Sequence, residues 1–287
     1  MKIGVMAQRF ALPLTQSLDA ASKTGADGVQ LYAVSPREDL LAFSPGQRRE
    51  VRRMCDALGL EIFSICGEVG GFGFREREKN QGKIDRIKRS VDLALALGCR
   101  IVTSHIGVIQ PHPSPLRENQ LTALREIGGF AASCGAVMAV ETGPEGGAVL
   151  RAFLDELDQP GIAVNLDPGN MVMVPGENPV FSARVLAPYI RHTHIKDGRR
   201  MRRCDPEKVY AAFATGGIRR LIAENGRIFE ETPVGQGDID WRSYLAELKK
   251  AGGFAFPAVI ERETSDNAFP EVCACVRFIR EIAAALE

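Results

Sequence analysis

Short runs of apolar residues recur eight times along the chain, and each run predicts a buried strand. The runs are KIGVMA, GVQLYA, EIFSIC, RIVTSH, VMAVET, GIAVNLD, IRHTHIK and PAVIERE. Their residues are too apolar for either face to be solvated, which is typical of parallel strands covered by helices. The pattern therefore predicts eight strands in the interior of the protein.

Segments with a helical period separate these strands. Their apolar residues fall near positions i, i+3, i+4 and i+7, as on one face of a helix. The segments are 14–25, 45–59, 83–98, 118–135, 148–158, 179–189, 241–252 and 269–287. Gly25, Gly59, Gly98 and Gly135 each close a segment just before a strand, as glycines at helix ends commonly do. Eight strand-helix units predict an α/β fold, a closed (β/α)8 TIM barrel.

An open, doubly wound sheet is the competing architecture. That fold usually carries a glycine-rich phosphate loop after its first strand, and here the position reads AQRFALP. We therefore expect one barrel domain over residues 1–287. It has an extended loop after the seventh strand, at residues 198–237, on the side where barrel enzymes carry their active-site loops.

Four metal-competent side chains mark the ends of four successive predicted strands. Glu141 ends VMAVE, Asp167 ends GIAVNLD, His194 lies in HTHIK and Glu261 ends PAVIE. Singly, each has an ordinary explanation: a solvated or ion-paired glutamate, a turn aspartate before Pro-Gly, or a hydrogen-bonded core histidine. Together, at equivalent strand ends, they predict a site for Mn²⁺, Mg²⁺ or Co²⁺, because oxygen ligands with one imidazole suit these ions.

The composition of the chain limits the classes of partner that it is expected to bind. The chain has 36 acidic and 36 basic side chains and a formal net charge of zero, which gives no general attraction to nucleic acid or to an anionic membrane. The first residues are too polar for a secretory signal, and no apolar stretch reaches the length of a membrane span. The seven cysteines are scattered without zinc-site spacing. We expect a cytoplasmic protein with reduced thiols and a small-molecule partner.

Five segments, in this order, resemble the xylose isomerase-like barrel superfamily of sugar phosphate isomerases and epimerases: VETGP, NLDPGNM, HTHIKDG, PVGQGDIDW and VIERE. The resemblance spans essentially the whole chain. In ketose 3-epimerases of this superfamily a Glu, an Asp, a His and a Glu hold the metal. The corresponding residues here are Glu141, Asp167, His194 and Glu261. The resemblance implies a divalent cofactor, with Mn²⁺ preferred and Mg²⁺, Co²⁺ or Zn²⁺ as alternatives.

Epimerisation next to a carbonyl removes a weakly acidic C–H proton and returns one to the opposite face. Two carboxylates on opposite sides of the substrate can do this through an enediolate, and Glu141 and Glu261 are the natural catalytic pair. We expect a keto-sugar or a sugar derivative as substrate.

Several further residues are expected at the substrate. Arg200 matches a substrate-binding arginine of the epimerases, and Lys196 belongs to a Lys-Asp pair common in the superfamily. Asn170 stands where these epimerases often have a histidine, which indicates altered substrate contacts. His105 matches a position often occupied by histidine. His192 shares the face of His194 and is expected to lie deeper in the barrel.

The segment CGEVGGFGF follows the third strand and is expected to overhang the mouth of the barrel. Its Glu68, Phe72 and Phe74 are candidates to cover one face of a sugar.

Other functions stay open at this point. A lyase or dehydratase acting on a keto-inositol or a 3-keto-glycoside would use the same deprotonated substrate. An apurinic-site endonuclease shares the barrel but needs many histidine ligands and a basic groove, against four histidines and zero net charge here. A sugar-binding barrel without catalysis is the non-enzyme alternative. Barrels of this kind often form homodimers or tetramers.

Overall fold

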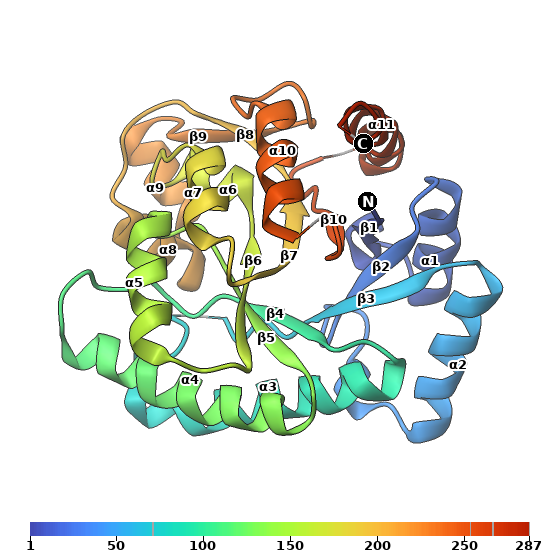
Figure 1. Cartoon of the computed structure of the whole chain (residues 1–287), viewed down its shortest axis with the longest axis horizontal. Helices are drawn as coiled ribbons and strands as arrows, with labels where there is room; N and C mark the ends of the chain where they lie inside the picture. The colour runs from blue at the N-terminus through green and yellow to red at the C-terminus, as the bar shows by residue number, and fades with distance from the viewer. Residues whose placement is uncertain (71, 253, 266, 287) are drawn as a thin grey trace.

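Eight parallel strands close into a barrel in the computed structural model, which describes residues 1–70, 72–252, 254–265 and 267–286. The barrel strands are β1 (Ile3–Met6), β2 (Gly28–Tyr32), β3 (Glu61–Cys66), β4 (Ile101–Ser104), β5 (Val137–Glu141), β6 (Ile162–Leu166), β7 (Ile190–Ile195) and β10 (Ala258–Ile260). Around the barrel they follow the order β1, β10, β7, β6, β5, β4, β3, β2, and each neighbouring pair is parallel. Each predicted run forms one of these strands, so the predicted (β/α)8 fold is confirmed (Figure 1).

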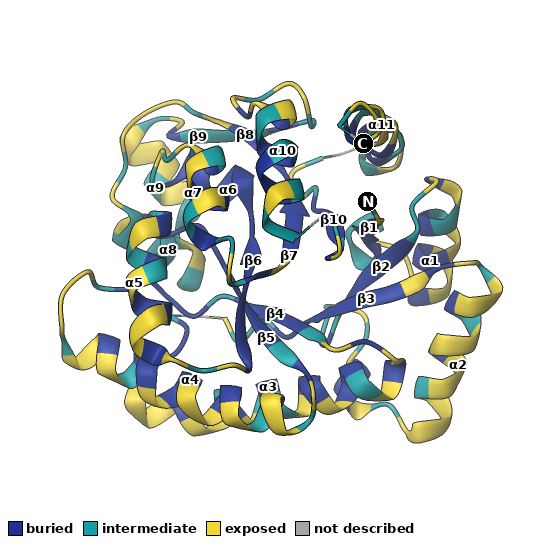
Figure 2. Ribbon diagram, viewed as in Figure 1, coloured by how far each residue is buried: buried dark blue, intermediate teal, exposed yellow. Residues whose placement is uncertain are grey.

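Helices follow the strands and cover the outside of the barrel (Figure 1). The predicted helical segments form α1 (Leu14–Lys23), α2 (Pro45–Ala57), α3 (Arg77–Leu97), α4 (Pro115–Ser133), α5 (Gly147–Leu157), α7 (Pro179–Leu186), α10 (Trp241–Gly252) and α11 (Ala268–Ala284). Three short elements add to them: η1 (Ala7–Phe10), η2 (Leu40–Ala42) and α6 (Pro168–Met173). Figure 2 shows the strands buried and the outward helix faces exposed, as the apolar periodicity predicts.

One helix begins earlier than its pattern predicts. α3 starts at Arg77, six residues before the expected start at Lys83. The added turns contain only polar residues and glycine, so they carry no apolar period that a sequence analysis can detect. Asn80 ties the first turn of α3 to the loop before it, because its buried side-chain amide donates to the Phe74 carbonyl at 2.8 Å. A side-chain hydrogen bond to the preceding loop, and not amphipathicity, therefore marks the start of α3.

An aromatic ring, Phe63, packs inside the barrel. Phe63 on β3 packs with Met6, Cys66 and Val259. A Cβ atom on Gly4 would lie 2.7 Å from the Phe63 ring, and one on Gly28 would lie 2.3 Å from the Glu61 carbonyl oxygen. Glycine is required at Gly4 because the ring occupies the space that a side chain would need, and at Gly28 because the Glu61 backbone and the ring together occupy it.

The segment 198–237, expected as an extended loop, is largely folded. It contains α8 (Pro206–Ala214) and α9 (Ile218–Asn225), and two antiparallel strands, β8 (Asp197–Arg200) and β9 (Phe229–Thr232), form its stem. Val209 and Ile228 pack against Met173 and Val174 of the α6 region. Helices of only two turns show too little apolar period to be detected in the sequence, so tertiary packing decides their structure.

Two expectations drawn from composition concern membranes and thiols. Within the described ranges, no helix is both long and apolar enough to cross a bilayer. All seven cysteines are free, and the closest pair in sequence is split between the buried Cys275 and the partly exposed Cys273.

Candidate metal centre

Four side chains converge at the C-terminal mouth of the barrel. Glu141 ends β5, Asp167 follows β6, His194 lies on β7 and Glu261 follows β10. All four are buried, and one ligand atom from each lies within 4.8 Å of all the others. The structure thus brings together the four residues that the sequence predicted as metal ligands.

The spacing of these atoms fits a divalent cation. His194 Nδ1 lies 3.4 Å from Glu141 Oε1, 3.4 Å from Asp167 Oδ2 and 3.4 Å from Glu261 Oε2. Ligands at about 2.1 Å from a common ion are separated from one another by about 3 Å, so small shifts suffice to coordinate one. Three carboxylates and one imidazole match the preference of Mn²⁺ or Mg²⁺ for oxygen ligands.

Asp167 acts both as a turn residue and as a member of this group. Its Oδ1 accepts the backbone N–H of Asn170 at 2.8 Å and thereby caps α6, while its backbone N–H donates to Thr142 Oγ1 at 2.8 Å. Oδ2 faces His194 Nδ1 at 3.4 Å and Lys196 Nζ at 3.8 Å. The Asp-Pro-Gly turn therefore holds one carboxylate oxygen in a fixed position at the mouth.

Gln30 orients the imidazole of His194. Its Oε1 lies 3.0 Å from His194 Nε2, and its own amide nitrogen donates to Thr103 Oγ1 at 2.7 Å. Because the amide oxygen can only accept, Nε2 carries a proton, and Nδ1 is the nitrogen that faces the three carboxylates and could bind a cation. The neighbouring charges support a cation there: burial lowers the pKa of His194, but Glu261 and Glu141 raise this pKa well above its ordinary value.

Replacing Gln30 by methionine is expected to weaken Mn²⁺ binding by about 10–100-fold, since His194 would lose the acceptor that fixes its ring. Gln30→Glu keeps an acceptor oxygen and is expected to stay close to wild type. Isothermal titration calorimetry measures both dissociation constants. Unchanged affinity in Gln30→Met would contradict the orienting role.

His192 lies deeper in the barrel, as predicted, and stands outside the ligand group. Its Nε2 is 2.9 Å from Ser64 Oγ and its Nδ1 is 2.7 Å from Asn165 Oδ1. Its ring meets that of His194 edge-on, with 5.5 Å between centroids. Burial, and then the nearby His194, lower the pKa of His192 well below its ordinary value. His192 is thus a neutral support beneath the mouth.

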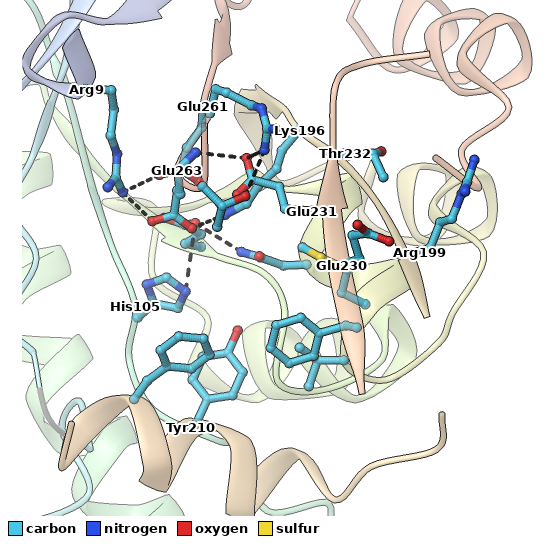
Figure 3. Close-up of a pocket in the computed structure, with 18 of the residues that line it drawn as sticks. Arg9, His105, Lys196, Arg199, Tyr210, Glu230, Glu231, Thr232, Glu261 and Glu263 are labelled. Atoms are coloured by element: carbon cyan, nitrogen blue, oxygen red, sulfur yellow. Dashed lines mark hydrogen bonds and ion pairs between the residues drawn. The ribbon is translucent and has the colours of Figure 1, made fainter. Parts of the chain in front are cut away.

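A network of ion pairs surrounds Glu261 (Figure 3). Lys196 Nζ lies 2.9 Å from Glu261 Oε2 and 2.6 Å from Glu263 Oε2. Arg9, from the turn after β1, pairs with Glu263 and lies 3.4 Å from Glu261 Oε1. Burial raises the pKa of Glu261, but Lys196 and His194 outweigh this and hold the pKa well below its usual range. Glu261 is therefore a carboxylate at neutral pH.

Three more predicted residues lie around Glu141. Asn170 donates from its side-chain amide to Glu141 Oε1 at 3.2 Å. His105 Nε2 lies 3.8 Å from the same oxygen, and His105 Nδ1 lies 3.1 Å from Glu68 Oε2. Burial lowers the pKa of His105, but Glu141 and Glu68 raise it to about 10. His105 is therefore an imidazolium that can donate to a substrate oxygen.

Arg200 and Phe74 lie elsewhere. The Arg200 guanidinium donates to the Pro175 carbonyl at 3.1 Å, and the residue is not among those that line the mouth, whereas Arg199 is. Phe74 is fully buried and faces the core, so the expectation that it covers a sugar face is wrong. Phe72, half-buried, also lies outside the lining of the mouth.

These residues open into a cavity of about 1050 Å³ that the folded segment 198–237 partly covers. Tyr210 on α8 reaches back to the barrel rim: a Cβ on Gly143, whose φ is 149°, would lie 2.3 Å from the Tyr210 oxygen. Arg9, Gln30, Glu263 and Tyr210 were absent from the predicted site. Gln30 had one signal in the sequence, because it is a polar residue within the apolar run GVQLY.

Glu145 lies near this site but stands apart from the ligand group. It is buried, and its Oε2 accepts the backbone N–H of Ile109 at 3.3 Å. Burial raises the pKa of this carboxyl to about 8 from an ordinary 4.5. The Glu145 carboxyl therefore binds its proton more tightly in the folded protein than in the unfolded chain.

Protonation of Glu145 should stabilise the fold fully below pH 4.5, and this stabilisation should be lost as the pH rises through about 8. Glu145→Gln keeps the acceptor for Ile109 and removes the titration. We expect the melting temperature of the wild type to fall more steeply from pH 5 to pH 9 than that of the variant. Parallel melting profiles would contradict this.

Residues 18–282 match the model of the xylose isomerase-like TIM barrel. A 3-dehydroshikimate dehydratase of Pseudomonas putida is 26% identical over 257 residues, which cover 86% of this chain and 36% of that protein. The chain thus spans about a third of the length of this dehydratase.

A second curated relative matches over most of its own length. It is a 2-epi-5-epi-valiolone 7-phosphate 2-epimerase of an Actinoplanes species, 26% identical over 227 residues, which cover 77% of this chain and 80% of that protein. Among solved structures, a xylose isomerase-like TIM barrel protein from Mycobacterium smegmatis in complex with magnesium aligns with a TM-score of 0.74. The alignment covers 100% of this chain and 97% of that one at 20% identity, which shows a shared fold.

Proposed function

The chain belongs to the xylose isomerase-like TIM barrel family, and from this membership and the geometry of the site we propose that it is a divalent-metal-dependent sugar isomerase or epimerase. It acts on the carbon next to a carbonyl of a keto-sugar or sugar derivative. Mn²⁺ is the proposed ion, held by Glu141, Asp167, His194 and Glu261. The magnesium complex of the M. smegmatis relative supports a hard divalent ion.

The observation that carries this proposal is the placement of Glu141 and Glu261. They come from β5 and β10, which are three places apart in a closed ring of eight strands, so their carboxylates approach the mouth from nearly opposite walls. A substrate between them has one carboxylate near each face. One can remove a proton and the other can return a proton to the opposite face.

The surrounding residues suit this exchange. Lys196 and His194 keep Glu261 ionised and hence able to accept a proton. His105, as an imidazolium, donates a hydrogen bond to the oxygen on which negative charge develops in the enediolate. When bound, the divalent cation supplies further positive charge that stabilises this oxyanion.

Dehydration is the second candidate. The similarity to the P. putida dehydratase favours it, and so does the protonated His105 beside Glu141, because an imidazolium can give its proton to a departing hydroxyl group. Elimination then follows the same first deprotonation. The two candidates differ only in what happens to the enediolate.

Proton NMR in deuterated water tests the proposal. Mn²⁺-loaded protein is incubated with a panel of keto-sugars and keto-inositols, and the manganese is chelated before the spectra are recorded. An epimerase exchanges one C–H for deuterium and produces a stereoisomer without loss of water. A dehydratase produces a conjugated enone that absorbs in the ultraviolet. Absence of both across the panel would overturn the proposal.

A further inference from the structure

The cavity has two chemically different ends. One end holds the four candidate ligands with their ion pairs, and the other lies against α8, α9 and β9 of the folded segment. We call the second the apolar end and define it by Tyr210, Phe213, Ile222 and Phe229. Both ends belong to one continuous space of about 1050 Å³, which is as large as pockets that hold drug-sized ligands.

Aromatic rings run from the candidate centre into the apolar end. The His105 and Tyr210 rings lie 5.7 Å apart, Tyr210 and Phe213 lie 6.4 Å apart, and Phe213 stacks on Phe229 at 6.4 Å with 23° between the ring planes. Phe213 is 53% exposed and Ile222 is 36% exposed, although both face the cavity. This arrangement leaves apolar area that a flat or apolar group can cover.

In the described part of the chain, the apolar end offers no unpaired cation to an anion. Arg227 pairs with Glu230 at 3.1 Å, and Arg199 lies 3.8 Å from Asp238. A carboxylate or phosphate at this end would compete with these carboxylates for the two guanidinium groups.

The cations at the opposite end are engaged as well. Lys196 and Arg9 share Glu261 and Glu263, and Arg262 lies 2.9 Å from Glu231. Figure 3 shows Arg9, Lys196 and these glutamates gathered at one side of the cavity. Among the described residues, every lysine and arginine of the lining therefore has a carboxylate partner.

We propose that the substrate is an uncharged polyol joined to an apolar ring. The polyol lies at the candidate metal centre, and the ring lies among Tyr210, Phe213 and Phe229. This rests on the proposed function, because it assigns the reacting carbon to the polyol end. It names a substrate class that the reaction alone does not specify.

The apolar end is built into the fold. Glu207 on α8 pairs with the buried Arg75 at 2.6 Å and also accepts from Gln110, both of which belong to the barrel side. These bonds hold α8 over the mouth, so Tyr210 is positioned before any ligand arrives. A preformed surface loses little conformational entropy on binding.

Calorimetry on the Mn²⁺-loaded full chain tests the proposal with unreactive probes. Phenyl β-D-glucopyranoside is expected to bind at least about tenfold more tightly than methyl β-D-glucopyranoside, because burying a phenyl ring is favourable. Phenyl β-D-glucuronide, which adds a carboxylate, is expected to bind more weakly than the phenyl glucoside. Phe213→Ser should remove most of the preference for phenyl. Phe181→Ser, at an equally exposed phenylalanine on α7 outside the cavity, should retain it.

Equal affinity for the two glucosides, no binding of either, or tighter binding of the glucuronide would overturn the proposal. Light scattering adds a further test: if Phe213→Ser converts a dimer to a monomer, the apolar end is a subunit contact and the proposal fails. The proposed function is judged separately, by deuterium exchange of small keto-sugars in the wild type. Exchange without a preference for phenyl leaves the function standing and removes only this inference.

Discussion

Glu261→Gln and Glu141→Gln are each expected to lower turnover by about 10³-fold or more while the protein stays folded. Glutamine has nearly the same shape as glutamate but cannot accept a C–H proton, and it is a poorer ligand for a divalent ion. In Glu261→Gln, Lys196 keeps Glu263 as a partner at 2.6 Å, so no buried cation is left alone. Deuterium exchange on an active keto-sugar measures the loss.

The control for these variants is Glu126→Gln. Glu126 on α4 pairs with Lys88 on α3 and does not line the cavity, so its substitution should leave exchange unchanged. Circular dichroism and melting curves confirm that each variant is folded. Near-normal exchange in both Glu141→Gln and Glu261→Gln would refute their assignment as the proton-transferring pair.

Mn²⁺ is expected to raise the melting temperature of the wild type by roughly 5 °C or more at 100 times its dissociation constant. Binding at that concentration stabilises the folded state by about 2.7 kcal/mol, and each kcal/mol shifts the midpoint of a chain of this size by about 2 °C. The physical source is the group of three carboxylates within 4.8 Å, whose mutual repulsion a divalent cation relieves.

Asp167→Asn provides the matched variant. An asparagine oxygen can still accept the Asn170 N–H and cap α6, so the local fold is expected to persist. The charge and the metal bond are lost, and the Mn²⁺-induced shift should disappear, as it should for the wild type with excess chelator. No shift in the wild type with Mn²⁺, Mg²⁺ or Co²⁺, or a full shift in Asp167→Asn, would contradict the site.

The barrel was predictable because its strands carry their signal locally. Each strand is an apolar run, and four of these runs follow a helix-ending glycine, so strand number and order follow from the sequence. The start of α3 was not predictable because a side-chain hydrogen bond from Asn80 to the preceding loop marks it. The helices α8 and α9 were not predictable because packing, such as that of Val209 against Met173 and Val174, stabilises them.

The site divides in the same way. Glu141, Asp167 and Glu261 were predicted because a charged residue at the C-terminal end of a barrel strand faces the mouth of the barrel. Arg9 and Tyr210 were missed, since one follows β1 in a short turn and the other lies on an unpredicted helix. Their nearness to the site arises only when the ring of strands closes.

Asp197 gives the folded segment a property of its own. Its buried carboxylate accepts the backbone N–H groups of Gly198, Gly235 and Gly237 and the indole N–H of Trp241. The beginning and the end of segment 198–237 are therefore both bound to one side chain. Because the two ends of segment 198–237 are held together, the entropic cost of closing the loop between them depends only weakly on the number of residues in the loop. Changes in the length of residues 201–228 are thus expected to leave the barrel closed, provided that a replacement segment again covers Met173 and Val174 and supplies a carboxylate to the buried Arg75.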